Sequence, residues 1–156
     1  MTTPENAIKG SSSAKTAFPP TRLAVSSLFL LNGTFAGAWA PKIPEFASRL
    51  SLSESGLGLM IMCFGIGSLV LMPIAGFLIA HYGTTRTVKA ASVLFLLPLI
   101  LLSLAPTVPL GALAIFLFGG LMGAMDVAMN GNAVEVEKSM RRAIMSSCHA
   151  FWSLGA

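Results

Sequence analysis

A single carboxylate lies inside one of the most apolar stretches of the chain. Asp126 falls within residues 110–130, where nearly all the remaining residues are Gly, Ala or a larger apolar type. An ionisable side chain at bilayer depth costs at least ~2.5–3.5 kcal/mol, so such residues are rare and are functional by default. We interpret Asp126 as a group that handles protons or a polar solute. The alternative is an acid that only hydrogen-bonds a neighbouring helix or caps a kink.

Polar side chains elsewhere are candidates to share a cavity with this acid. Asn130 follows four residues after Asp126, so the two share one face of a helix. His149 is the only histidine in an apolar segment; it either packs as an ordinary histidine or lines the cavity opposite Asp126. Asn32 lies in the first apolar segment and is a further lining candidate. Trp39, near the end of that segment, is either an interfacial anchor or a stacking platform for a sugar-like ring.

Other chemistry finds little support in the chain. It contains no Gly-x-x-x-x-Gly-Lys-Ser/Thr phosphate loop and no Gly-x-Ser-x-Gly nucleophile motif. His149 has no second His or Cys at ligand spacing, which argues against a metal site. Glu135 and Glu137, beside basic residues, are expected to form a solvated charge cluster. The sequence therefore predicts no enzyme activity, no cofactor and no metal.

The composition requires a membrane. Hydrophobic residues make up 54% and charged residues 10% of the 156 positions, whereas soluble domains carry about 25% charged residues. Roughly 20 apolar residues cross a bilayer as a helix. We predict an all-α membrane protein with four transmembrane helices and the start of a fifth, at about 23–40, 57–80, 88–105, 110–133 and 143–156, the last incomplete. Pro98 is expected to kink the third helix, and the loop after residue 40 has room for a short surface helix.

The charged residues predict the orientation. Cytoplasmic loops carry an excess of Lys and Arg. With the N-terminus inside, eight of the ten basic residues are cytoplasmic and two are not: Lys9, Lys15, Arg22, Arg86, Lys89, Lys138, Arg141 and Arg142 against Lys42 and Arg49. We therefore expect a multi-pass protein of the plasma (inner) membrane with a disordered cytoplasmic tail at residues 1–20, and no binding to nucleic acid. A cleaved signal peptide ending at Ala40 is the competing interpretation.

Small residues mark the helix faces that pack closely. Gly33 and Gly37 in the first apolar segment are four residues apart, as are Gly119 and Gly123 in the fourth. This spacing lets two membrane helices approach closely. Gly119 and Gly123 share the face of Asp126 and Asn130. Cys63 and Cys148, both in apolar surroundings, are interpreted as free thiols.

Two segments resemble the major facilitator superfamily. Residues 76–86, Gly-Phe-Leu-Ile-Ala-His-Tyr-Gly-Thr-Thr-Arg, are similar to the signature cytoplasmic loop of that family, Gly-x-Leu-Ala-Asp-Arg-x-Gly-Arg. Gly76, Gly83 and Arg86 match the pattern, while Ala80 and His81 stand at its Asp and Arg.

The second match is to one bacterial inner-membrane branch, similar to the fucose/proton symporters. The segment Asp126-Val-Ala-Met-Asn130 resembles their Glu-x-Ala-x-Asn, which implies a role for Asp126 in substrate and proton handling. The segment from His149 to Gly155 resembles their Gln-x-Phe-Asn-Ser-x-Gly, which places His149 and Trp152 at the substrate site. The second acid of those symporters would fall near Ala40, where no acid is present.

This resemblance implies a function for the chain. It indicates transport of a small organic solute by a secondary transporter with alternating access, and makes a proton a candidate coupling ion. The chain would be the N-terminal part of a six-helix half, truncated, with the C-terminal half of the transporter missing. Its partners would be the lipid bilayer, the solute and protons. The alternative is a small helical membrane protein that acts as a subunit or assembly factor without transport activity.

Overall fold

The computed structural model describes residues 19–156, so the tail predicted at residues 1–20 lies almost wholly outside the described part. All regular structure within these residues is helical, which confirms the all-α class. The helices, in chain order, are α1 (Pro20–Trp39), the short 3-10 helix η1 (Ala40–Lys42), α2 (Ile43–Arg49), α3 (Glu54–Tyr82), α4 (Thr84–Leu94), α5 (Leu96–Leu104), α6 (Val108–Met140) and α7 (Met145–Gly155).

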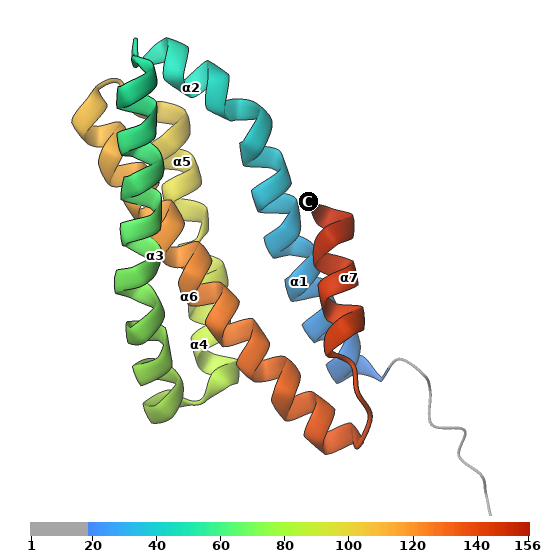
Figure 1. Cartoon of the computed structure of the whole chain (residues 1–156). Coiled ribbons are helices and arrows are strands. Elements are labelled where there is room, and N and C mark those ends of the chain that lie inside the picture. Colours follow the sequence, from blue (N-terminus) through green and yellow to red (C-terminus); the bar gives the residue numbers. More distant parts are fainter. Residues whose placement is uncertain (1–18) are drawn as a thin grey trace, which may run out of the picture.

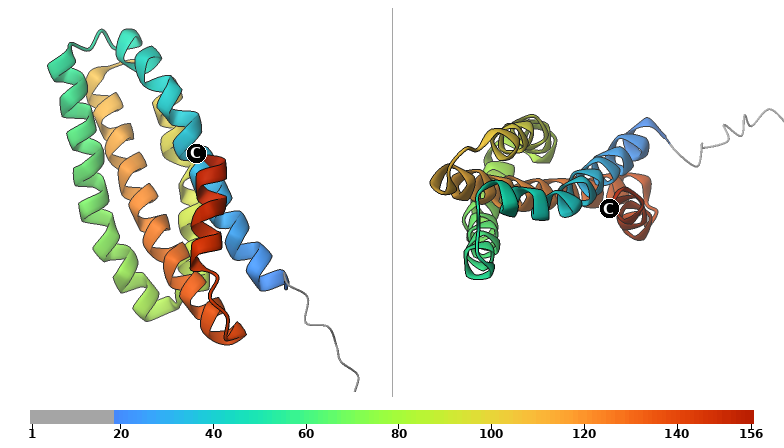
Figure 2. Two further views of the ribbon diagram at one scale, coloured as in Figure 1. Left: turned by 45° about the vertical axis from the view of Figure 1, so that its right-hand side comes forward. Right: turned by 90° about the horizontal axis from the view of Figure 1, so that it is seen from above.

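Helix α6 is the centre of the bundle. It packs against α1, α3, α4, α5 and α7, and its most extensive contact is with α3. The second extensive contact joins α1 and α7, which run side by side although they are far apart in sequence (Figures 1 and 2). The fold therefore contains two tight helix pairs, α3 with α6 and α1 with α7.

Local sequence explains where the helices begin and end. Pro20 stands in the first turn of α1, where its missing N–H costs nothing. Ser53 caps α3 by accepting a hydrogen bond from the Gly56 amide at 3.2 Å. Gly83, with φ of 83°, makes the sharp turn between α3 and α4.

The third predicted span is broken where a proline predicts a break. Phe95 separates α4 from α5, and Pro98 lies three residues later. A proline inside a helix cannot donate to the carbonyl four residues earlier, here that of Leu94, and its ring crowds that carbonyl. The expected kink is therefore present.

Three of the four glycines predicted to pack closely, Gly33, Gly37 and Gly119, lie against backbone atoms of a neighbouring segment, and so does Gly67, which was not predicted. A Cβ at Gly119 would collide with the backbone of Phe64, and one at Gly67 with the carbonyl of Phe116, so α3 and α6 touch through their backbones. A Cβ at Gly33 would collide in the same way with the carbonyl of Trp152 on α7. Without these glycines neither helix pair could approach as closely.

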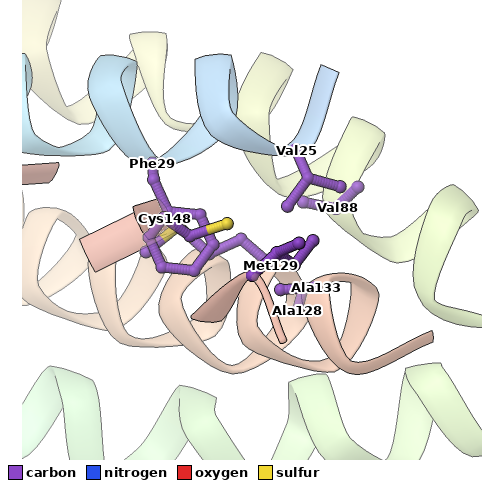
Figure 3. Packing of buried hydrophobic residues seen from close by; sticks show 8 residues of the cluster. Val25, Phe29, Val88, Ala128, Met129, Ala133 and Cys148 are labelled. Carbon is purple, nitrogen blue, oxygen red and sulfur yellow. The ribbon is translucent and has the colours of Figure 1, made fainter. Parts of the chain in front are cut away.

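A buried cluster fastens the two pairs to each other. Val25 and Phe29 of α1, Cys148 of α7 and Val88 of α4 pack against α6 (Figure 3). The residues contributed by α6 are Ala128, Met129 and Ala133. Cys148 is fully buried and Cys63 half-buried, and both are free thiols, as predicted.

Within residues 19–156, four helical stretches are long and apolar enough to cross a membrane. They cover Pro20–Arg49, Glu54–Tyr82, Thr84–Leu104 and Val108–Met140. The large apolar side chains of Leu59, Leu69 and Phe77 on α3 are more than half exposed, and such an extended apolar surface is typical of a helix that faces lipid. The fourth helix, which was expected to end at about residue 133, continues to Met140 and ends where Arg141 adopts a left-handed conformation. Glu135, Glu137 and Lys138 lie inside this helix, so the charged residues did not mark its end.

Candidate functional site

A pocket of about 300 Å³ lies against Asp126. Its walls come from four helices, two from each tight pair: α1, α3, α6 and α7. The lining residues are Asn32, Phe64, Ser68, Met72, Met122, Gly123, Asp126 and Trp152. The pocket therefore brings together three predicted site residues, Asn32, Asp126 and Trp152, on a mostly apolar surface.

The carboxylate of Asp126 is half-buried and held from its own helix. The side-chain amide of Asn130 donates to Asp126 Oδ1 at 3.2 Å and to the Asp126 backbone carbonyl at 2.9 Å. Asn130 thus occupies the predicted face, one turn below the acid, and restricts its rotation. Asn130 does not itself line the pocket.

Asn32 and Trp152 join α1 to α7 at the pocket. Trp152 Nε1 donates a hydrogen bond to Asn32 Oδ1 at 2.9 Å, across 120 residues of sequence. Asn32 is 1% exposed. Within residues 19–156, its Nδ2 atom is buried and has no hydrogen-bond partner.

His149 lies beside the acid but does not line the pocket. It makes an edge-on contact with Phe29, the ring centroids being 5.2 Å apart, and its side chain is largely exposed. His149 and Asp126 are not within ion-pair distance: the ion pair found among residues 19–156 joins Lys42 to Glu45. Both predicted interpretations of His149 stay open.

Trp39 lies away from the pocket. Its ring packs against Phe46, at 5.5 Å between centroids, and against Phe118, at 5.7 Å. These contacts place it in an aromatic cluster between α1, α2 and α6, beside a separate apolar pocket of about 300 Å³. The structure therefore does not bring Trp39 together with Asp126.

The signature loop is fastened to α6. Thr84, directly after Gly83, donates a hydrogen bond to Glu135 Oε2 at 2.5 Å, and Asn132 donates to Thr84 Oγ1 at 3.4 Å. Arg86 and Gly76 are exposed, and a Cβ at Gly76 would meet nothing within 4 Å. The loop therefore depends on Thr84, whose role the motif did not predict.

Two further polar residues were missed or misread in the sequence. Ser68 lines the pocket and donates to the Gly119 carbonyl at 2.7 Å, tying α3 to α6; its only signal was a lone hydroxyl amid apolar residues. Glu137 accepts from the backbone amides of Ile144 at 2.8 Å and Met145 at 3.1 Å, so it caps α7. Glu135 and Glu137 were expected to form a solvated charge cluster; both also accept hydrogen bonds, Glu135 from Thr84 and Glu137 from the first amides of α7.

Comparison with known proteins identifies the family. The model of the Major Facilitator Superfamily matches residues 25–156, nearly the whole chain. The chain belongs to the major facilitator superfamily. It is therefore a multi-pass membrane protein of a transporter family, and no solved structure matches it.

Three relatives support this assignment. An uncharacterised transporter of Sinorhizobium fredii, y4wD, is 43% identical over 132 residues, which are 85% of this chain and 35% of that protein. An uncharacterised MFS-type transporter of Yersinia pestis is 42% identical over 86% of this chain and 34% of that protein. The membrane protein MosC of Rhizobium meliloti is 33% identical over 85% of this chain and 32% of that protein. The chain thus spans about a third of the length of the curated relatives it matches.

Proposed function

We propose that this chain forms part of one wall of the solute pathway in a secondary transporter of the plasma (inner) membrane. The solute is a small organic molecule. Asp126 binds either this solute or a proton that crosses the membrane together with the solute or in exchange for it. The observation that supports the proposal is the pocket in which Asp126, Asn32 and Trp152 converge from three helices. Ionisable groups inside membrane segments typically mark such pathways.

The rest of the pathway comes from outside this chain. Transporters of this architecture bind their solute between two repeats that rock against each other. Because the chain spans about a third of its relatives, the opposing wall belongs to the remaining two thirds. His149 is exposed and does not line the pocket, so it is available to that wall.

The test uses a chimaera with a relative. Residues 25–156 replace the matching third of the y4wD transporter, and the product is reconstituted in vesicles that contain a pH-sensitive dye. Fucose, glucose, lactate, succinate and phenylethanolamine are added singly, and solute uptake and internal pH are followed. We expect uptake of at least one solute with a pH change, and loss of that coupling in Asp126→Asn.

The matched control neutralises another acid of the same helix. Glu135→Gln lies outside the pocket and keeps a side-chain oxygen that can accept from Thr84, so this variant is expected to transport normally. Unchanged uptake and unchanged pH dependence in Asp126→Asn would exclude Asp126 from the mechanism. A folded chimaera that takes up none of the solutes would refute transport by this chain and favour the alternative, a subunit or assembly factor.

The proposed orientation has its own test. Single cysteines are placed at Arg86 and at Lys42 in a background without Cys63 and Cys148. A membrane-impermeant maleimide added to intact cells should label the cysteine at position 42 and not the one at 86. The reverse pattern would place the N-terminus outside.

A further inference from the structure

The unpaired amide of Asn32 points to the chemistry of the solute. The indole N–H can only donate, so its hydrogen bond with Asn32 fixes the amide orientation: Oδ1 faces Trp152 and Nδ2 faces away. Nδ2 is then a buried donor with no partner among residues 19–156. Buried polar groups nearly always have a partner, so each exception calls for an explanation.

The other polar groups of the pocket are already committed, apart from one. The Ser68 hydroxyl donates to the Gly119 carbonyl. Oδ1 of Asp126 accepts from the side-chain amide of Asn130. No described residue donates to the second carboxylate oxygen of Asp126. This wall therefore offers a solute one amide donor and one carboxylate oxygen, set among Phe64, Met72 and Met122.

We propose that the solute is a small organic amine that also carries a hydroxyl or carbonyl oxygen. This rests on the proposed function and names the substrate class of the same pocket. The amine binds the Asp126 carboxylate, because within residues 19–156 that acid has no ion-pair partner. The oxygen accepts a hydrogen bond from Asn32 Nδ2, and the apolar part of the solute contacts the methionine and aromatic side chains.

Trp152 is the neighbour through which solute binding can be detected. Its indole N–H is bonded to Asn32 Oδ1 at 2.9 Å, and Nδ2 at the other end of the same amide is inaccessible in this conformation. An oxygen therefore reaches Nδ2 only after a local shift around this bonded pair. Binding of the solute is therefore expected to change the environment of this indole.

Three matched probes separate the two contacts. Phenylethanolamine has both the amine and the oxygen, phenethylamine lacks the oxygen, and phenethyl alcohol lacks the amine. The 156-residue chain is placed in lipid nanodiscs with Trp39→Phe, which leaves Trp152 as the only tryptophan. Binding is read from its fluorescence, and thermal unfolding confirms the fold of each variant.

The expected pattern distinguishes recognition from structure. Asn32→Leu should weaken phenylethanolamine binding about tenfold, the effect of one lost hydrogen bond, and leave phenethylamine binding unchanged. Asp126→Asn should weaken both amines. Ser27→Ala, on the exposed side of α1, is the control.

Several outcomes would overturn the proposal. Equal weakening of both amines by Asn32→Leu would make Asn32 structural, and no weakening would exclude it from recognition. A lack of response to all three probes would refute the substrate class. Binding here without uptake in the chimaera would remove only the proposed function. Uptake of phenylethanolamine that is indifferent to Asn32→Leu would remove only this inference.

Discussion

Two glycines of α3, two residues apart, should respond oppositely to the same substitution. A Cβ at Gly67 would meet the carbonyl oxygen of Phe116 and the amide nitrogen of Gly120, both backbone atoms of α6. A Cβ at Gly65 would meet nothing within 4 Å. Gly65→Ala therefore tests helix propensity alone, whereas Gly67→Ala adds the steric cost of separating α3 from α6.

The magnitudes follow from these surroundings. Replacing a helical glycine by alanine stabilises the helix by about 0.5–1 kcal/mol, so Gly65→Ala should raise the free energy of unfolding by that amount. Inserting a methyl group into a tight contact costs about 1–3 kcal/mol, and backbone atoms cannot rotate aside. Gly67→Ala should therefore be less stable than Gly65→Ala by about 1–3 kcal/mol.

The assay is SDS-induced unfolding of each variant in mixed micelles, followed by circular dichroism. Because Ser68 binds the Gly119 carbonyl beside this contact, Gly67→Ala is also expected to disturb the pocket. Equal stability of the two alanine variants would show that α3 and α6 do not approach through their backbones at Gly67, and the close-packed pair described above would be wrong.

The remaining predictions concern contacts at the helix ends and the thiols. Arg49 donates hydrogen bonds to the carbonyls of Leu102 and Ser103 and so caps the end of α5. Arg49→Met should lower the free energy of unfolding by about 1 kcal/mol, and Arg49→Lys should lower it by less. Equal stability of the parent chain and both variants would exclude this capping role. Glu137→Ala should speed amide hydrogen exchange in the first turn of α7, while Glu137→Gln, which keeps an acceptor, should change it less; identical exchange in both would contradict the capping role. In single-thiol variants, Cys63 should react with N-ethylmaleimide faster than the buried Cys148, and the opposite order would mean that α7 does not pack as described.

Much of the fold follows from local rules that the sequence displays. Pro98 predicts the break between α4 and α5, because a proline disturbs the hydrogen bonding and packing of the helical turn directly before it. The glycines at four-residue spacing predict close helix approach, since spacing defines a face. Spacing does not name the partner, however: nothing in the sequence indicates that Gly33 meets α7 and Gly119 meets α3.

The candidate site was predicted only in part, because contacts within one helix follow from residue spacing whereas contacts between helices do not. Asp126 and Asn130 are four residues apart, and their hydrogen bond follows from helix geometry. The bond between Asn32 and Trp152 spans 120 residues and depends on how α1 and α7 pack. Glu137 looked like a solvated charge because its partners, the amides of Ile144 and Met145, reach it only after the chain reverses through the left-handed Arg141.

The pocket lies where the two tight helix pairs meet, and this determines how it can respond to a solute. Asn32 and Trp152 belong to the α1–α7 pair, whereas Asp126 and Ser68 belong to the α3–α6 pair. Glycine contacts hold each pair together through backbone atoms that cannot adjust, so a shift between the pairs requires less rearrangement than a shift within either. Such a shift changes the separation of Asn32 from Asp126 directly. A solute that contacts both Asn32 and Asp126 therefore binds more tightly to one arrangement of the two helix pairs than to others. Such a difference in affinity between conformations is what any ligand-driven conformational change requires.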